Sequence, residues 1–276
     1  MHENNSFLTL TYNDENLGDG RLHYEDFQKF MKRLRDNVYH QTIKDTPDWH
    51  SLSPEIQKNL QNSKKVGFFV TGEYGDTTKR PHWHAIVFNW RPPTPTYHYT
   101  SKSGHKVYKC ETLSKLWPHG FAEFGDVTFE SAGYVARYAA KKLAHGDEVS
   151  KFEPISKKSN HQAIGKTFLS KFWKDIFQNG ECLIQTDSGI QRVPIPRYYE
   201  KWLQKYHPYQ WEHYVTQTKL KTIRQATHKS DKQKYLYNLN SHYRAPFKGP
   251  EITHSEIQKV IIEQRFKLLQ SYLKGD

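Results

Sequence analysis

The stretch GEYGDTTKRPHWHAIVF, residues 72–88, decides the fold because it predicts two antiparallel strands joined by a short loop. His82 and His84 open a run that alternates like a half-buried strand, with Trp83 between them. Successive strand side chains point to opposite faces, so the two histidines share a face and Trp83 takes the other. Glu73 lies on the preceding strand, where a short loop would bring it opposite the pair.

Glu73, His82 and His84 are therefore candidate ligands for one divalent metal ion. Imidazole nitrogens and a carboxylate oxygen suit Mn²⁺, Mg²⁺ or Zn²⁺, and three protein ligands leave coordination positions open for a substrate. The chain has 16 histidines, so about one His-x-His pair is expected by chance. The alternative is a pair of surface histidines, but the strand context and the position of Glu73 favour the metal site.

A second candidate site lies on a helix predicted over residues 131–144, SAGYVARYAAKKLA. Tyr134 and Tyr138 are four residues apart and share one helix face, which Lys141 and Lys142 flank. A nearby ammonium group favours the phenolate, and a metal ion makes a bound phosphate easier to attack, so DNA cleavage through a phosphotyrosine is possible. The alternative is an aromatic stripe in the core, since 18 tyrosines give about one such pair by chance.

The composition favours a nucleic-acid partner. The chain has 276 residues and a formal net charge of +12, which suits a polyanion. Aromatic residues make up 14% of it, which suits unpaired bases, although an aromatic-rich core under a solvated basic surface would have the same composition. Two distant cysteines indicate neither a disulfide scaffold nor a zinc cluster. With no signal peptide and no membrane-spanning run, we expect a cytoplasmic protein with no membrane partner.

The order of predicted elements indicates an α+β domain over residues 1–145. Strands are expected at 7–12, 66–73, 82–89 and 120–129, and helices at 24–38, 111–117 and 131–144, with a polar connector to residue 63 and an exposed loop at 90–109. This order fits a central antiparallel sheet with flanking helices packed on one face.

Residues 146–276 are expected to form a mainly helical extension that binds DNA or a partner. A polar linker at 145–162 is followed by a helix at 166–177, a hairpin at 181–195 turning at 187–189, a helix at 197–206, and long polar helices near 208–238 and 254–273.

Taken together, these motifs resemble those of the HUH endonucleases, the rolling-circle replication initiators, and most closely those of the microviruses, small single-stranded DNA bacteriophages. The matching residues are FLTLTY at 7–12, GEYGDTTKRPHWHAIVFN at 72–89, LWPHGFAEFGDVTFESAGYVARYAAKK at 116–142 and IGKTFLSKF at 164–172. The resemblance covers residues 7–177 and implies a ferredoxin- or RRM-like sheet in the core domain.

The resemblance also implies a reaction. His82, His84 and Glu73 would hold Mg²⁺ or Mn²⁺, Tyr134 and Tyr138 would be the two nucleophiles, and Lys141 or Lys142 would assist near the phosphate. One tyrosine would nick single-stranded origin DNA and stay joined to the 5′ end, and the second would attack after one round of synthesis. The setting would be the host bacterial cytoplasm, with the host polymerase extending the free 3′-OH.

Two further expectations complete the sequence analysis. The only P-loop candidate, Gly165-Lys166-Thr167, has Asn160 where the first glycine would stand, so a host helicase is expected to open the duplex. The alternatives to a phage initiator are a plasmid initiator, relaxase or transposase of the same superfamily, which gene neighbours would distinguish, and a non-catalytic single-strand-binding module, whose binding a chelator would not change.

Overall fold

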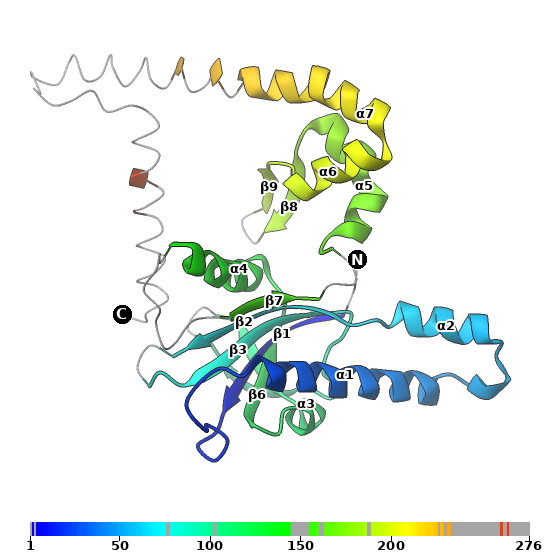
Figure 1. Cartoon of the computed structure of the whole chain (residues 1–276), viewed down its shortest axis with the longest axis vertical. Helices are drawn as coiled ribbons and strands as arrows, with labels where there is room; N and C mark the ends of the chain where they lie inside the picture. Colours follow the sequence, from blue (N-terminus) through cyan, green and yellow to red (C-terminus); the bar gives the residue numbers. More distant parts are fainter. Residues whose placement is uncertain are drawn as a thin grey trace, which may run out of the picture. The chain divides into compact units, whose positions relative to one another are not determined.

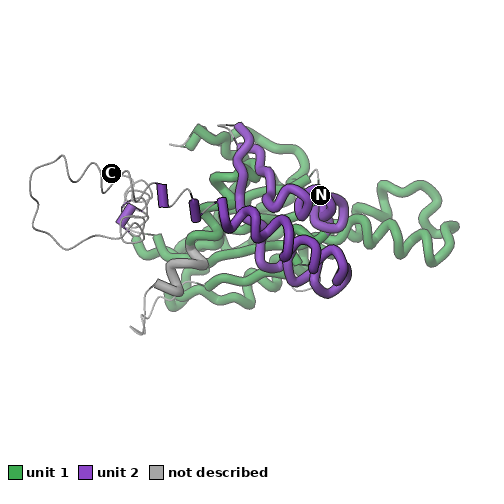
Figure 2. Tube along the Cα trace, turned by 90° about the horizontal axis from the view of Figure 1, so that it is seen from above, with its two compact units in different colours: residues 1–166 green, residues 167–276 purple. Residues whose placement is uncertain are grey.

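The computed structural model describes residues 2, 4–75, 78–101, 104–144, 155–159, 163–186, 189–225, 227–228, 231–232, 260–261 and 264, with residues 138–144 described by their backbone alone. The chain forms two compact units, residues 1–166 and 167–276 (Figure 2). The first contains a seven-stranded antiparallel sheet with helices, and the second contains helices and a hairpin. The predicted α+β class, with a mainly helical second part, is confirmed.

The sheet of the first unit has the strand order β4-β5-β6-β1-β3-β2-β7. Its strands are β1 (Asn5–Tyr12), β2 (Gly67–Tyr74), β3 (Pro81–Phe88), β4 (Thr96–Thr100), β5 (Lys106–Lys109), β6 (Gly120–Gly125) and β7 (Ile155–Lys158). The first strand of the chain lies in the middle, where β1 pairs with β3 on one side and β6 on the other. Alternate β1 residues are buried because one of its faces packs into the main core.

Helices cover both faces of this sheet (Figure 1). They are α1 (Tyr24–Asp45), α2 (Pro54–Ser63), α3 (Glu111–Leu116) and α4 (Phe129–Ala144), with a short 3₁₀ turn, η1 (Trp49–Ser51). α1 buries four apolar side chains at helical spacing in the main core: Phe27, Phe30, Met31 and Leu34. α4 packs on the opposite face, against β2, β3 and β7. The expectation that all helices share one face was therefore wrong.

The polar connector predicted over residues 39–63 was also wrong. α1 continues to Asp45, and α2 follows after Ser53, whose hydroxyl accepts a hydrogen bond from the backbone N–H of Ile56. Pro54 occupies the first turn, as is common at helix starts. α2 has no buried residue, so the apolar periodicity that reveals most helices is missing from its sequence.

Three short strands lie where the sequence predicted none. β4 and β5 form a hairpin inside the expected loop at 90–109, and every residue of β4 is exposed, which removes the alternation typical of strands. β7 lies inside the expected linker and pairs with β2 at the sheet edge. The strand predicted over 120–129 ends at Gly125, and Phe129 begins α4.

The second unit has its own core. Its elements are α5 (Lys166–Asn179), β8 (Cys182–Thr186), β9 (Gly189–Val193), α6 (Arg197–Tyr206), α7 (Pro208–His213) and a π-helical segment, η2 (Tyr214–Lys219). The predicted helices at 166–177 and 197–206 and the hairpin at 181–195 are confirmed. The helix predicted near 208–238 is described only in its first half, and that near 254–273 lies almost wholly outside the described residues. Over the described chain, none of the helices has the length and apolar character needed to cross a bilayer.

Candidate active site

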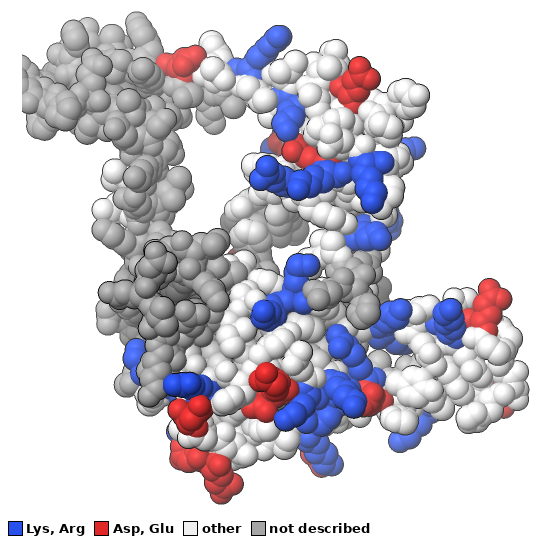
Figure 3. Space-filling model, in the orientation of Figure 1, with Lys and Arg blue, Asp and Glu red and all other residues white. Residues whose placement is uncertain are grey.

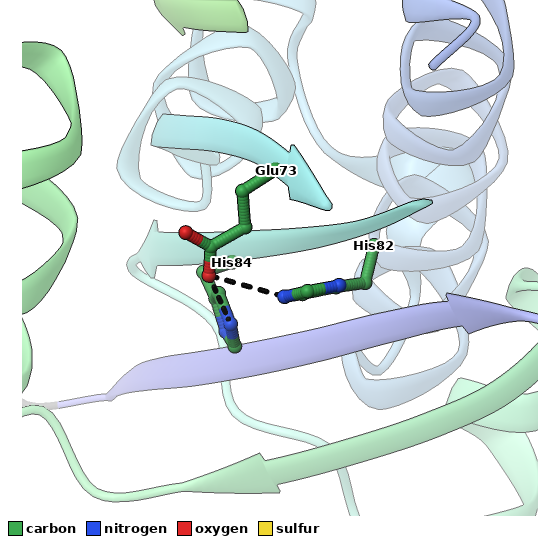
Figure 4. A group of neighbouring side chains, drawn as sticks. All are labelled: Glu73, His82 and His84. Atoms are coloured by element: carbon green, nitrogen blue, oxygen red, sulfur yellow. Dashed lines mark hydrogen bonds and ion pairs between the residues drawn. The ribbon is translucent and has the colours of Figure 1, made fainter. Parts of the chain in front are cut away.

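The two histidines of the β3 strand face the same side as Glu73 of β2 (Figure 4). Trp83 points the other way and is fully buried in the main core, which fixes the direction of its two neighbours. Glu73 is directly opposite His82 in the β2–β3 register. Glu73 Oε1 lies 3.1 Å from His82 Nε2 and 2.9 Å from His84 Nε2. The structure thus brings the three predicted ligands together.

The outer nitrogen of each imidazole ring has its own partner. His82 Nδ1 is 3.1 Å from the backbone carbonyl oxygen of Arg80, and His84 Nδ1 is 3.2 Å from the Thr9 hydroxyl. A carbonyl oxygen only accepts, so a neutral His82 ring donates from Nδ1 and presents the lone pair of Nε2 to Glu73. Such second partners are how proteins orient histidine ligands of metal ions.

The donor set fits a divalent cation. One ligand atom from each of the three residues lies within 4.8 Å of the other two. The second carboxylate oxygen of Glu73, Oε2, is buried and has no hydrogen-bond partner within the described structure. A buried, unpartnered carboxylate oxygen costs free energy unless a cation or proton approaches it. The residues therefore form a possible metal-binding triad of two imidazoles and one carboxylate.

The electrostatics of the triad favour a charged carboxylate and neutral imidazoles. Burial disfavours the charged form of Glu73, but hydrogen bonds from His82 and His84 outweigh it and lower the pKa of the carboxyl to about 2. Burial also lowers the pKa of His84 below its ordinary value, against the opposing effect of Glu73. Both shifts preserve the protonation states in which a carboxylate and an imidazole bind a metal ion.

Tyr134 reaches the triad from α4. Its hydroxyl donates a hydrogen bond to Glu73 Oε1 at 2.9 Å, and its ring packs edge-on against His84, with centroids 5.0 Å apart. The helix is held over the triad because Val135, the next residue, is fully buried. The candidate nucleophile and the candidate ligands, which lie on separate motifs in the sequence, share one site.

The other predicted residues of α4 are placed only by the backbone. Tyr138 lies one helical turn beyond Tyr134, and Lys141 and Lys142 lie in the following turn. The side chains of these three residues lie outside the described part of the chain, so their contacts with the triad stay predictions.

Three residues that the sequence analysis did not single out belong to the site. Phe7 stacks on His84, with centroids 5.5 Å apart and planes inclined by 16°, and Thr9 hydrogen-bonds the same ring. Their signal was the strand alternation at 7–12, which puts both on the face of the histidines. Arg137 lies three residues after Tyr134, and its Nε is buried without a hydrogen-bond partner among the described residues. That spacing puts a permanent cation beside Tyr134.

Comparisons with known proteins agree with the motifs. The family model of the replication-associated proteins of the ORF2 type matches residues 5–143, which include β1, the triad and most of α4. The chain is 41% identical to replication-associated protein VP4 of Bdellovibrio phage phiMH2K over 276 residues, which is 99% of this chain and 81% of that protein.

Two other phage proteins match over less of their length. Replication-associated protein ORF4 of Chlamydia phage 1 is 32% identical over 211 residues, 74% of this chain and 47% of its own. Replication-associated protein ORF2 of Spiroplasma virus 4 is 28% identical over 210 residues, 74% of this chain and 59% of its own. No solved structure matches the chain.

Proposed function

Because the chain belongs to the family of replication-associated proteins of the ORF2 type, we propose that it starts rolling-circle DNA replication by nicking and rejoining single-stranded origin DNA. The observation that carries the proposal is the 2.9 Å hydrogen bond from the Tyr134 hydroxyl to Glu73, the carboxylate that also contacts His82 and His84. A nucleophile and a possible metal site thus lie within contact distance.

The triad would hold the metal ion. Glu73, His82 and His84 offer hard oxygen and nitrogen ligands, which suit Mg²⁺ or Mn²⁺. When bound, such an ion would neutralise charge on the scissile phosphate and so make its phosphorus easier to attack. Phe7 and Thr9 would keep the His84 ring in place, since both contact it in the structure.

The side chains of α4 would carry out the exchange of bonds. The Tyr134 oxygen would attack the phosphorus, forming a phosphotyrosine on the 5′ end while the bond from phosphorus to the 3′ oxygen breaks. The phenol loses one proton and the leaving 3′ oxygen gains one, so the step is balanced. Arg137, three residues on with an unpartnered Nε, would bind a phosphate oxygen, and Lys141 or Lys142 would add positive charge.

Tyr138 would repeat the reaction. After one round of synthesis it would attack the regenerated origin, and the released 3′-OH would attack the first phosphotyrosine and close a circle. A host helicase and a host polymerase would act at the nick, in the bacterial cytoplasm. Two tyrosines one helical turn apart would let a single metal site serve both attacks.

The second unit would contact DNA through α6. Arg197, Lys201 and Lys205 recur every fourth residue along one exposed face, about 6 Å apart along the helix axis. None of the three has an ion-pair partner among the described residues. Tyr199 and Leu203 anchor the opposite face of α6 in the core of the second unit. Figure 3 shows Lys and Arg side chains gathered over this part of the second unit.

The decisive experiment looks for the covalent intermediate. The full chain is incubated with Mg²⁺ or Mn²⁺ and viral-strand origin DNA, and tryptic peptides are analysed by mass spectrometry for a phosphotyrosyl nucleotide. We expect adducts on Tyr134 or Tyr138, and none after chelation or in the double variant Tyr134→Phe, Tyr138→Phe. An adduct in the double variant would show that the nucleophiles are assigned wrongly. Binding without any adduct would favour a non-catalytic module.

A further inference from the structure

The face of the sheet that carries the triad has a covered half and an open half. α4 packs over β2, β3 and β7 on this face. β1 and β6 continue the same face beyond β3, and Figure 1 shows α4 on the β2 and β7 side. Tyr134 and the triad lie at the border between the halves. A DNA strand that reaches Tyr134 must therefore pass over the open half or around α4.

An exposed aromatic ring lies on the open half in line with the triad. Phe121 of β6 is opposite Thr11 of β1, which is opposite His82 of β3, which is opposite Glu73 of β2. These side chains share one face because directly paired residues point the same way. Neighbouring strands are about 4.8 Å apart, so Phe121 lies about 10 Å from His82 along this row. Its side chain is 61% exposed.

A second ring is fixed on the same face nearer the sheet edge. The Tyr99 hydroxyl donates a hydrogen bond to Glu123 Oε2 at 3.2 Å, and His98 Nε2 lies 3.3 Å from Glu123 Oε1. A register shift between Tyr97 and Tyr99 lets both His98 and Tyr99 reach that carboxylate. Glu123 is opposite Thr9, the residue that holds His84. Tyr99 is 44% exposed although its hydroxyl is fixed.

We propose that Phe121 and Tyr99 form a stacking surface for unpaired bases of the strand that is cut at Tyr134. The identity of the ligand rests on the proposed function, whereas the surface rests on the exposed rings and their register with the triad. Unpaired bases stack on aromatic side chains with little dependence on sequence. Large apolar rings on a solvent-facing sheet surface, in a chain of net charge +12, suit the bases of a polyanion.

The stacking surface would fix which phosphate reaches the nucleophile. A base held by Phe121 belongs to a nucleotide close to the scissile phosphate, because the ring lies only two strands from His82. Tyr99, two strands further out, would hold the strand as it leaves the site. Both residues would therefore position the substrate without touching the reacting atoms.

The test measures binding of a fluorescent dT20 single strand by the full chain in EDTA, so that no chemistry is needed. Stacking is worth about 1–3 kcal/mol per base, which corresponds to about a 5- to 150-fold change in Kd. We expect Phe121→Ala to weaken binding within this range, Phe121→Leu to weaken it similarly, and Phe121→Trp to keep it. Tyr39→Ala is the matched control, because Tyr39 is also 44% exposed but lies on α1, which packs on the other face.

Equal affinity of Phe121→Ala and the Tyr39→Ala control would overturn the proposal, as would tight binding by Phe121→Leu, which keeps the apolar volume but no ring. A second measurement uses the unaltered chain, so it does not depend on the folding of a variant. A dT20 strand carrying 5-iodouracil is photocrosslinked, and the modified peptide is identified by mass spectrometry. We expect cross-links to Phe121 or Tyr99, and cross-links confined to α1 or α2 would overturn the proposal. A loss of binding by Phe121→Ala in a chain that never forms an adduct would refute the proposed cleavage and leave the stacking surface intact.

Discussion

The Tyr134 hydroxyl and Glu73 Oε1 are joined by a 2.9 Å hydrogen bond, which links α4 to β2 at the point where His82 and His84 also meet the carboxylate. One oxygen atom therefore has three polar neighbours from three positions in the sequence. The other oxygen, Oε2, is buried and has no partner among the described residues. The removal of the charge from this group should affect the metal ion and the tyrosine together.

Replacing the triad carboxylate by an amide should abolish metal binding while the fold survives. Glu73→Gln keeps the size of the side chain but removes the negative charge that a divalent ion needs, so we expect Mn²⁺ affinity measured by calorimetry to fall at least about 100-fold. Adduct formation should fall with it. Glu123→Gln is the matched control, because Glu123 lies on the same face but pairs with His98 and Tyr99. Equal Mn²⁺ affinity in the two variants would exclude the triad as the metal site.

The hydroxyl behind His84 should tune the same affinity without touching the metal ion. Thr9→Val removes the 3.2 Å partner of His84 Nδ1 and keeps the shape of the side chain, so we expect Mn²⁺ to bind about 10- to 100-fold more weakly. Thr11→Val is the control, since Thr11 lies beside His82 on the same face but its hydroxyl contacts none of the triad in the described structure. A similar loss in both variants would point to a general effect of threonine removal from β1.

Gly72 should be intolerant of even a methyl group. An added Cβ would lie 2.6 Å from Cζ3 and 2.8 Å from Cε3 of the Trp83 indole, which is fully buried and cannot move aside. We expect Gly72→Ala to destabilise the first unit by about 1–3 kcal/mol in thermal or denaturant unfolding. Gly133→Ala is the control, because a Cβ there meets nothing within 4 Å, and alanine is the better helix former by about 1 kcal/mol. A neutral Gly72→Ala would show that the indole has room to shift.

The stability of the first unit should fall at alkaline pH because of Tyr12. Burial raises the pKa of the Tyr12 phenol well above its ordinary value of 10, and its hydrogen bond to Asp26 acts in the same direction. The folded state thus holds the proton more tightly than the unfolded chain does. The resulting stability is complete below about pH 10 and is lost as the pH rises further.

Tyr12→Phe tests this assignment. The variant should start less stable by about 1–3 kcal/mol, because the Trp83 indole N–H loses its acceptor, 3.2 Å away. Its free energy of unfolding should nevertheless depend less on pH between about 10 and 12 than that of the unaltered chain. Parallel pH profiles of the two proteins would assign the alkaline loss to other groups.

The sequence predicted the strands of the site correctly because their apolar periodicity is strong. Leu8, Leu10 and Trp83 alternate with Thr9 and His84, and each set lies on the predicted face. The resemblance to phage replication initiators, which rested on the order of three motifs, is confirmed by the comparisons. The elements that were missed, α2, β4 and β7, are exposed or lie at a sheet edge, where burial leaves no periodic pattern.

The three-dimensional pairing explains what the sequence could not give. The choice of face for α4 depends on packing over β2, β3 and β7, and β7 lies in a segment with too little apolar character to be recognised as a strand. The contact of Phe7 with His84 depends on the β1–β3 register, which the sequence leaves undetermined until the whole sheet is assembled. Residues far apart in sequence therefore had candidate roles before they had a common site.

The cationic face of α6 should contribute a measurable share of the salt dependence of duplex DNA binding. Each phosphate contact by Lys or Arg adds about 0.9 to the slope of log K against log salt concentration. We expect the triple variant Arg197→Gln, Lys201→Gln, Lys205→Gln to lower the slope by about 2–3, with equal weakening on unrelated duplex sequences. These residues are exposed, and Tyr199 and Leu203 still anchor the helix, so the unfolding temperature should stay the same.

The control for this slope removes the same number of charges elsewhere. Lys32, Lys44 and Lys58 are exposed on α1 and α2 of the first unit, away from the face that carries the triad. Their change to glutamine lowers the net charge of the chain equally, so it tests whether total charge or the position of the charge matters. A slope that falls by the same amount in both triple variants would mean that α6 is a solvated surface, and that the second unit contacts DNA elsewhere or has another partner.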